Sequence, residues 1–243
     1  MPENKIYIGT SGWSYKHWKG RFYPEGLKEK DHFSYYMERF NTVELNNKFY
    51  HLPKKETFTA WKKAVPGDFI YAVKASRYIT HLKRLHDPEE STALFFEHAL
   101  LLGKKLGPVL FQLPPFMKIN LELLKHFLKQ LSKKYRYVFE FRNESWYTED
   151  VYKLLKKYNC AFCIYELEGH LSPLEITADF IYVRLHGPGA KYSGDYSEKT
   201  LKEWAKRCKS WLKTKDVYVY FDNDQDAYAA FNALRLKDLV KKI

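Results

Sequence analysis

Charged side chains stand near the ends of several predicted strands, where they can bind a ligand or transfer protons. They are three cations and three carboxylates: Lys74, Arg142, Arg184, Glu44, Glu140 and Asp222. Guanidinium groups suit phosphate or carboxylate, because their N–H donors match the spacing of two oxygens. A carboxylate beside a bound substrate can serve as a general base. The set predicts acid–base chemistry on an anionic substrate, with Lys74, Arg142 and Arg184 holding the anion and Glu140 or Glu44 as the base.

Two histidines are candidates for proton transfer, because an imidazole titrates near neutrality. We expect His186 or His81 to act as the acid, and a hydrogen-bonded structural histidine is the alternative for each. The remaining histidines show no HxH or HExxH spacing, so no zinc site is predicted. A divalent ion held by Glu44, Glu140 and Asp222 would be repelled by the nearby guanidinium groups. We therefore predict no metal and no cofactor.

Other polar and aromatic residues are candidates for substrate contacts. Asn46 follows Glu44 at the same strand parity, and Gln112 ends another predicted strand. Trp13 and Tyr15 belong to an aromatic set that can stack on a base or a sugar, or can pack in the core instead. The rest of this set is Trp18, Phe22, Tyr23, Phe49, Tyr50 and Trp146.

Segment 135–146 alternates apolar and charged residues at period two, which predicts a strand. In a parallel sheet covered by helices, the residues facing the helices are apolar, so Glu140 and Arg142 must point to the other side. Charged groups inside a closed sheet are costly unless they meet solvent, a partner charge or a ligand. The strand therefore predicts a polar, solvent-filled site at its carboxyl end.

Strand-like and helical segments alternate along the chain. Buried-strand patterns occupy residues 5–9, 42–46, 69–74, 109–113, 135–146, 161–165, 180–186 and 216–222. Helical spacing occupies residues 27–40, 54–65, 88–106, 120–132, 148–158, 198–213 and 227–240. Residues 166–179 show no convincing helix, and the glycine-rich loop 187–196 is a possible mobile lid. Eight strands with intervening helices predict a single (β/α)8 TIM-barrel domain over residues 1–243, whose active site lies at the carboxyl ends of the strands.

Composition agrees with one large globular domain. The chain has 243 residues, of which 45% are hydrophobic and 18% aromatic, and single-domain barrels have about 250 residues. Cys160, Cys163 and Cys208 form no paired CxxC motifs, so we expect buried reduced thiols and a cytoplasmic protein. The N-terminal residues lack a signal-peptide pattern, and no apolar run is long enough to span a membrane.

The formal net charge of +12 allows nucleic acid or an anionic metabolite as a partner. Many lysines lie on predicted solvent-facing helix surfaces, which explains the charge without any partner. A purely structural ion-pair network is likewise an alternative to an active site. Two functions therefore stay open: hydrolysis of a phosphoester or phosphodiester, and non-catalytic binding of nucleic acid or a sugar phosphate. The oligomeric state is left undetermined.

Several short motifs together carry a family resemblance. They are Gly9–Tyr15 with Trp18 and Phe22–Pro24, Glu44–Asn46 with Phe49, Tyr50 and Pro53, Lys74, Thr80–His81, Gln112–Pro115, Glu140–Arg142 with Ser145–Trp146, Arg184–Gly187 and Asn223–Asp224. Over nearly the whole chain they resemble the bacterial and archaeal family known as domain of unknown function 72, or YecE-like proteins. The resemblance implies a TIM barrel and implies no reaction. The sequence departs from the family pattern at Asn143, where histidine is common, and at Asp222, where asparagine is common.

Overall fold

The structure is a computed structural model that describes residues 3–46 and 53–242. The described residues form two compact units. The first holds those of 1–44, 164–174 and 179–243, and the second holds those of 45–163 and 175–178. A single-domain organisation of the chain stays a prediction.

Three adjacent parallel strands form one part of the sheet in the first unit. β1 (Ile6–Thr10) and β8 (Phe180–Leu185) both pair with β9 (Asp216–Phe221), which lies between them. Glu44, in β2 (Thr42–Leu45), adds a parallel bridge to Ser11. These strands are rich in β-branched and aromatic residues and are almost wholly buried, as expected for strands covered on both faces.

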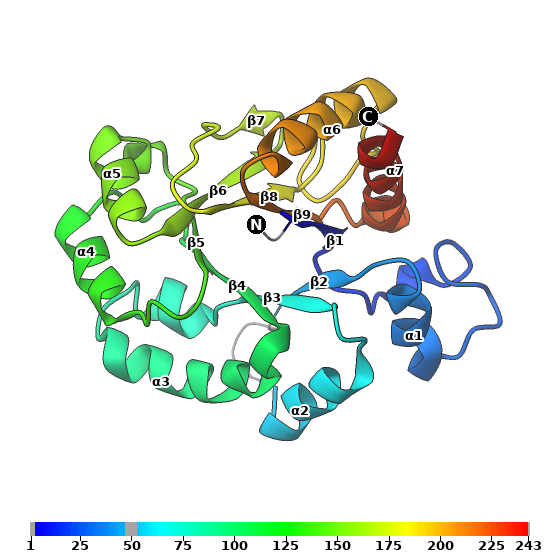
Figure 1. Ribbon diagram of the computed structural model, residues 1–243, viewed down its shortest axis with the longest axis horizontal. Helices are drawn as coiled ribbons and strands as arrows, with labels where there is room; N and C mark the ends of the chain where they lie inside the picture. The colour runs from blue at the N-terminus through cyan, green and yellow to red at the C-terminus, as the bar shows by residue number, and fades with distance from the viewer. Residues whose placement is uncertain (1–2, 47–52, 243) are drawn as a thin grey trace. The chain divides into compact units, whose positions relative to one another are not determined.

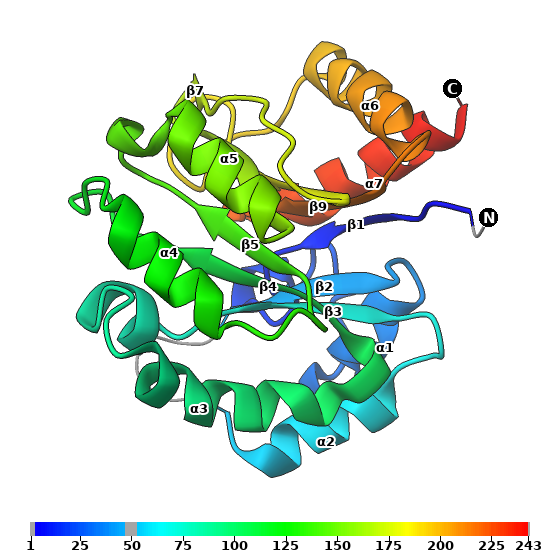
Figure 2. The ribbon, with the colours of Figure 1, turned by 60° about the vertical axis from the view of Figure 1, so that its left-hand side comes forward.

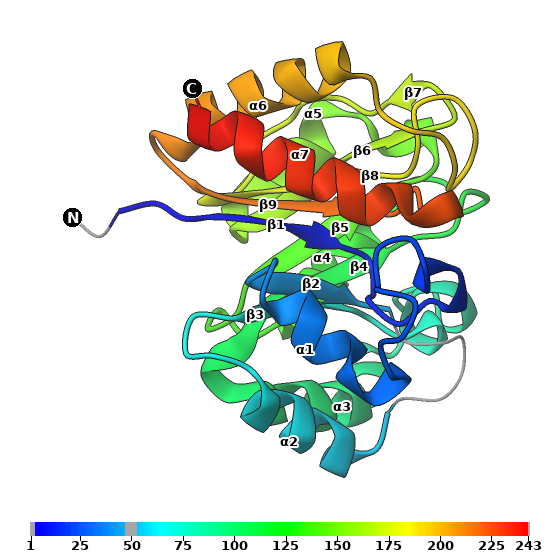
Figure 3. The ribbon, with the colours of Figure 1, turned by 90° about the vertical axis from the view of Figure 1, so that its right-hand side faces the viewer.

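Two long helices cover this sheet. α6 (Glu198–Leu212) and α7 (Tyr228–Lys242) pack side by side (Figure 1). α7 runs along β1 and β9 (Figure 3) and presents Ala229, Ala230 and Ala233 as buried residues. Small side chains at this spacing let the helix lie close to the strands.

The connection after the sixth strand begins with a two-residue turn, where the sequence predicted no helix. β6 (Cys160–Leu167) begins in the second unit and ends in the first, where it pairs with the antiparallel β7 (His170–Leu171). Glu168 and Gly169 both have positive φ, at 54° and 78°, as a tight two-residue hairpin requires. Residues 172–179 are all described and none is helical, which confirms the irregular connection.

The second unit has its own parallel sheet, in which β4 (Leu106–Gln112) pairs with both β3 (Ile70–Lys74) and β5 (Tyr137–Glu140). β5 also pairs with the start of β6. In the described part of this unit, the α-helices are α2 (Lys55–Ala64), α3 (Pro88–Ala99), α4 (Leu121–Gln130) and α5 (Glu149–Lys157). α4 and α5 lie side by side (Figure 2).

Side-chain caps set the starts of three helices. Asn120 accepts a hydrogen bond from the Leu123 amide at the start of α4, and Thr148 does so from Val151 at the start of α5. Ser197 caps α6 in the same way. Each cap satisfies an amide that the first helical turn leaves without a partner. These starts lie within one residue of those predicted.

Three predicted elements end early. β5 stops at Glu140 instead of continuing to Trp146, because the Asn143 side chain accepts from the Ser145 amide and folds 144–146 into a 3-10 turn. Arg142 therefore follows the strand instead of belonging to it. The helix predicted for 88–106 ends at Ala99, and Gly103 then takes a non-helical conformation. The helix predicted for 27–40 is reduced to α1 (His32–Met37) after a 3-10 turn.

The cysteines and the helices agree with part of the sequence analysis. Cys160, Cys163 and Cys208 are free and buried, as predicted. Burial raises the pKa of both the Cys160 and the Cys208 thiol to about 12, so both stay protonated near neutrality. Among the described residues, no helix has the length and apolar character needed to cross a membrane.

Candidate functional site

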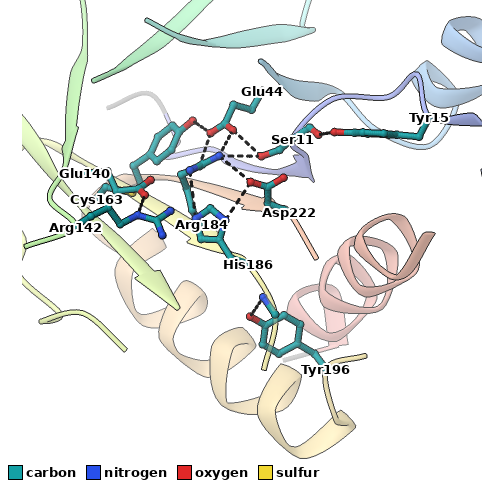
Figure 4. Close-up of polar contacts among 12 residues, drawn as sticks. Ser11, Tyr15, Glu44, Glu140, Arg142, Cys163, Arg184, His186, Tyr196 and Asp222 are labelled. Carbon is teal, nitrogen blue, oxygen red and sulfur yellow. Dashed lines mark hydrogen bonds and ion pairs between the residues drawn. The ribbon is translucent and has the colours of Figure 1, made fainter. Parts of the chain in front are cut away.

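A buried two-point ion pair joins β2 to β8 in the first unit (Figure 4). Arg184 Nε donates to Glu44 Oε2 at 2.9 Å, and Arg184 Nη2 donates to Glu44 Oε1 at 2.7 Å. The side chains are 1% and 0% exposed. Two charges removed from water are stable only if their remaining donors and acceptors are also satisfied. The neighbours of this pair therefore decide its role.

Glu44 receives two further hydrogen bonds. The Tyr182 hydroxyl donates to Oε2 at 2.7 Å, and the Ser11 hydroxyl donates to Oε1 at 2.6 Å. Burial raises the pKa of Tyr182 well above its ordinary value, so the hydroxyl keeps its proton. With four donors on a fully buried carboxylate, Glu44 has no lone pair directed at a substrate. This geometry suits an anchor for Arg184 better than the predicted general base.

Arg184 also reaches Asp222 and His186. Its Nη2 donates to Asp222 Oδ2 at 3.1 Å, and its Nη1 lies 3.3 Å from His186 Nε2. A guanidinium only donates, so His186 Nε2 must accept and the neutral ring carries its proton on Nδ1. His186 Nδ1 lies 3.1 Å from Asp222 Oδ2. Arg184 thus fixes both the tautomer of the imidazole and the carboxylate beside it.

Strand geometry explains why these residues meet. Tyr182 and Arg184 are two apart on β8 and share a face, and Arg184 pairs in register with Tyr220 of β9. Two residues beyond Tyr220, on the same side, comes Asp222. We call Ser11, Glu44, Tyr182, Arg184, His186 and Asp222 the strand-end network. It combines Glu44, Arg184, His186 and Asp222 as the parity argument predicted.

The strand-end network is drier than predicted. Asp222 is 16% exposed, whereas the side chains of Glu44, Arg184 and His186 are at most 1% exposed. The ring of Tyr192, itself exposed, packs edge-on against the His186 ring at 5.4 Å between centroids. The open, solvent-filled site expected from sequence is replaced by a buried cluster that meets solvent at Asp222.

The loop from Gly187 to Tyr196, which carries Tyr192, is held at both ends. The Gly187 amide donates to the Tyr196 hydroxyl at 3.1 Å, and Asn223 donates to the Gly194 carbonyl at 2.8 Å. Arg235 binds the Asp195 carboxylate at 2.6 Å. At its tip the Tyr192 carbonyl accepts from the Gln225 amide at 3.2 Å, so a lid movement would have to break this hydrogen bond.

Gly187→Ala is expected to lower the free energy of unfolding by about 1–3 kcal/mol, the cost of a backbone conformation that side chains avoid. The φ of Gly187 is +126°, and a Cβ would lie 2.2 Å from the Ser193 carbonyl oxygen and 2.6 Å from that of Ala190. Gly189→Ala in the same loop is the matched control, because its Cβ meets nothing within 4 Å. Chemical denaturation measures both, and equal stability of the two variants would refute this account of the turn.

A second charged pair lies in the second unit. Glu140, at the end of β5, is fully buried and accepts from Arg142 Nε, and Cys163 Sγ donates to its other oxygen at 3.7 Å (Figure 4). The Arg142 side chain is only 8% exposed. Gln112 pairs in register with Glu140 and donates to the Leu113 carbonyl. The structure therefore brings Glu140 and Arg142 together as predicted.

Lys74 and His81 are neighbours in this second unit. Burial lowers the pKa of His81 to about 4, and the positive charges of Arg77 and Lys74 add to the shift. The Thr80 hydroxyl lies 2.9 Å from His81 Nδ1. His81 is therefore neutral at neutral pH, which does not suit the predicted role of general acid.

His81 should make stability depend on pH. Its folded-state pKa of about 4 lies below its ordinary value of 6.5, so between these values the unfolded chain binds a proton that the folded protein does not. Stability is therefore expected to fall as the pH drops from about 6.5 to about 4. Urea denaturation at pH 7 and pH 4.5 should show a smaller loss for His81→Gln than for the wild type. An equal loss in both proteins would contradict the neutral His81.

The remaining residues predicted to contact a substrate differ in their exposure. Asn46 is exposed. Trp13 packs on Phe33, and the Tyr15 hydroxyl donates to the Ser11 carbonyl. Of the rest of the aromatic set, Phe49 and Tyr50 lie outside the described residues, and four are buried and packed in the interior instead of offering open ring faces. Those four are Trp18, Phe22, Tyr23 and Trp146.

The sequence analysis did not list three polar residues of the first unit as site candidates: Tyr182 and Ser11, which bind Glu44, and Asp224. Tyr182 shares the parity of Arg184 and was detectable by the same rule, whereas Ser11 lies just beyond β1 and depended on a bridge that no local pattern predicts. Asp224, two residues after Asp222, appeared only in the family motif. Within residues 3–46 and 53–242, no cluster of three or more His, Cys, Asp or Glu side chains has a metal-binding arrangement.

Comparison with known proteins identifies the relatives of this chain. It is 27% identical to the UPF0759 protein YunF of Bacillus subtilis over 97% of this chain and 94% of that protein. It is 30% identical to UPF0759 protein YecE of Escherichia coli K12 over 59% of this chain and 51% of that protein.

Solved structures confirm the predicted (β/α)8 TIM-barrel fold. A DUF72 family protein from Thermotoga maritima superposes with a TM-score of 0.89 at 30% identity, covering 98% of this chain and all of the other. A D-psicose 3-epimerase from Clostridium cellulolyticum superposes at 0.59 with 10% identity and shows the fold alone. The model of the family described as "Protein of unknown function DUF72" matches residues 7–243. The chain therefore belongs to the DUF72 family.

Proposed function

We propose that this protein is an enzyme that hydrolyses a phosphoester or phosphodiester, with His186 as its proton-transfer group. The observation that carries the proposal is the fixed arrangement of His186 between Arg184 and Asp222 at the carboxyl ends of neighbouring strands. Active sites of TIM barrels lie at these ends. An imidazole held in one tautomer beside a carboxylate can take a proton from an attacking water.

The roles divide according to burial and hydrogen bonding. Arg184 is bound by Glu44, Asp222 and His186, so it positions the other groups and is not available to clamp the substrate anion. Asp222 borders solvent and lies 3.1 Å from His186 Nδ1. Tyr192 covers the His186 ring, so the tip of its loop must move aside before a substrate reaches the imidazole.

Two loops next to His186 and Asp222 support a phosphate-containing substrate. In many TIM barrels the loops after the seventh and eighth strands, with a short extra helix, bind phosphate. Here the corresponding loops follow β8 and β9, and the second contains the short turn Gln225–Ala227, in which Asp226 has a φ of 58°. The first carries Lys191, whose side chain is exposed. Two of the carboxylates in these loops have partners: Asp226 pairs with Arg21, and Asp224 lies 2.9 Å from His17 Nε2.

A substrate panel tests the proposal. Purified wild-type protein is incubated with phosphomonoesters and phosphodiesters of alkyl and aryl alcohols, and released phosphate or alcohol is measured with and without added Mg²⁺. Hydrolysis of at least one class, lost in His186→Gln, is the expected result. No turnover of any member, or turnover unchanged in His186→Gln, contradicts the proposal.

Binding of nucleic acid or of a sugar phosphate without chemistry stays a prediction from charge and composition. The burial of most of the aromatic set leaves fewer ring faces for base stacking than the sequence suggested. The cytoplasmic setting also stays a prediction, in keeping with three free thiols.

A further inference from the structure

Asp224, two residues after Asp222 in the first unit, is a second partly exposed carboxylate with its own hydrogen-bonding partners. Its Oδ1 accepts a hydrogen bond from Trp18 Nε1 at 2.5 Å, and its Oδ2 lies 2.9 Å from His17 Nε2. His17 Nε2 is also 2.7 Å from the Asp224 carbonyl oxygen. A carbonyl only accepts, so this nitrogen carries a proton and donates. The carboxylate is thus held at both oxygens in one orientation.

The aromatic loop after β1 explains why Trp18 is a rigid donor. Trp18 is fully buried, and its ring packs against Tyr15, Phe22 and Tyr23 with centroids 5.1–5.7 Å apart. The side chain of Asp224 is 14% exposed, close to the 16% of Asp222. Both carboxylates therefore border solvent.

The surroundings of Asp224 raise its pKa toward neutrality, so that the carboxyl can exchange a proton near neutral pH. Burial raises the pKa of Asp224 to about 6, the hydrogen bond from Trp18 and the charge of His17 oppose the rise, and the negative charge of Asp222 adds to it. The phenols of Tyr15 and Tyr23 also interact with Asp224. Asp222, by contrast, is bound by the cation Arg184. Two nearby carboxyl groups in such different environments suit opposite tasks in acid–base catalysis.

We propose that Asp224 is the general acid of this site, oriented by Trp18 and His17, and that it protonates the leaving group while His186 deprotonates water. The inference rests on the proposed hydrolase function and adds to it a substrate class. An acid accelerates the reaction only where the departing oxygen is strongly basic. The substrate is therefore a phosphate ester of an alkyl alcohol, such as a sugar hydroxyl, and not a phenyl ester or an anhydride.

The step balances with water as the second reactant. The water oxygen forms a bond to phosphorus, and the bond from phosphorus to the leaving oxygen breaks. The loop tip moves aside and the contact of Arg184 Nη1 with His186 Nε2 opens, while Arg184 stays on Glu44 and Asp222 through Nε and Nη2. One water proton then passes to His186 Nε2, and the Asp224 proton passes to the leaving oxygen. The products are an alcohol and a phosphate with one ester bond fewer, and nothing is oxidised or reduced.

Leaving-group dependence tests the proposal. The substrates are two matched pairs, glycerol phosphate with 4-nitrophenyl phosphate and diethyl phosphate with bis(4-nitrophenyl) phosphate. Asp224→Asn is expected to lower kcat/KM about 100-fold for the alkyl ester and less than about 10-fold for the aryl ester, because nitrophenolate leaves without a proton. Equal losses on both esters overturn the role of Asp224 and leave the proposed function standing. Turnover of neither ester by the wild type removes the proposed function and this inference with it.

The variant Trp18→Phe provides a second test of the role of Asp224, which remains available if Asp224→Asn fails to fold. It keeps an aromatic ring but removes the N–H that stabilises the ionised carboxylate, so the pKa of Asp224 should rise. Activity that needs a protonated Asp224 declines as the pH rises past that pKa. The declining limb of the kcat/KM profile on the alkyl ester is therefore expected at higher pH in Trp18→Phe than in the wild type. A limb at the same pH in both proteins overturns the proposal.

Discussion

Arg184→Met is expected to lower the free energy of unfolding by about 3–5 kcal/mol, the usual cost of removing one partner of a buried ion pair. The substitution leaves Glu44 fully buried with hydrogen bonds from Tyr182 and Ser11 but without a countercharge. It also removes the donors that hold Asp222 and His186. Urea denaturation of both proteins at pH 7 measures the difference.

Two comparisons isolate the buried charge as the cause. Arg21→Met makes the same substitution in an exposed pair with Asp226 and should cost less than about 1 kcal/mol. The double variant Glu44→Gln/Arg184→Met removes both charges and should recover part of the lost stability. If Arg184→Met is no more harmful than Arg21→Met, the network does not stabilise the fold as described.

His186→Gln is expected to lower kcat for phosphoester hydrolysis about 10²- to 10⁴-fold, the range that general acid–base groups supply. The effect should fall on kcat more than on KM, since the imidazole acts on the attacking water and not on substrate binding. Asp222→Asn should cost less, because an asparagine oxygen can still accept from Arg184. Steady-state kinetics on the best ester of the panel measure all three proteins.

The matched control for this prediction is His126→Gln, on the exposed face of α4. Its kinetics should equal those of the wild type. A His186→Gln variant that keeps its fold by circular dichroism and still turns over the ester at the wild-type rate would remove His186 from the mechanism. In that case Asp222, which borders solvent, would be the next residue to test.

Local sequence patterns were sufficient to predict the architecture, because the spacing of apolar residues in each strand and helix reflects which face of that element is buried. The boundaries moved where side-chain hydrogen bonds end an element, as the Asn143 cap does after β5. The alternation of apolar and charged residues continues beyond Glu140 in the sequence. Only the turn-forming side chain of Asn143 indicates that the strand has ended.

For the site, parity placed Arg184 and His186 on one face of β8 and predicted that Glu44 and Asp222 would join them. Strand parity could not show that the hydrogen-bonding positions of the Glu44 carboxylate are already filled by other side chains. Glu44 is surrounded by donors from Ser11 and Tyr182, which lie 33 positions before it and 138 positions after it along the chain. Such long-range partners turn a predicted general base into an anchor. Tyr192, from the loop after β8, likewise closes over a ring that the sequence placed in solvent.

The tautomer of His186 tests the central claim most directly, because only a ring fixed by Arg184 is forced into one form. Nitrogen-15 NMR of histidine-labelled protein at pH 7, with His186 assigned by comparison with His186→Gln, resolves which ring nitrogen carries the proton. The strand-end network predicts a neutral ring protonated at Nδ1, on the side of Asp222, with Nε2 accepting from Arg184. A ring that carries a proton on Nε2 would contradict it.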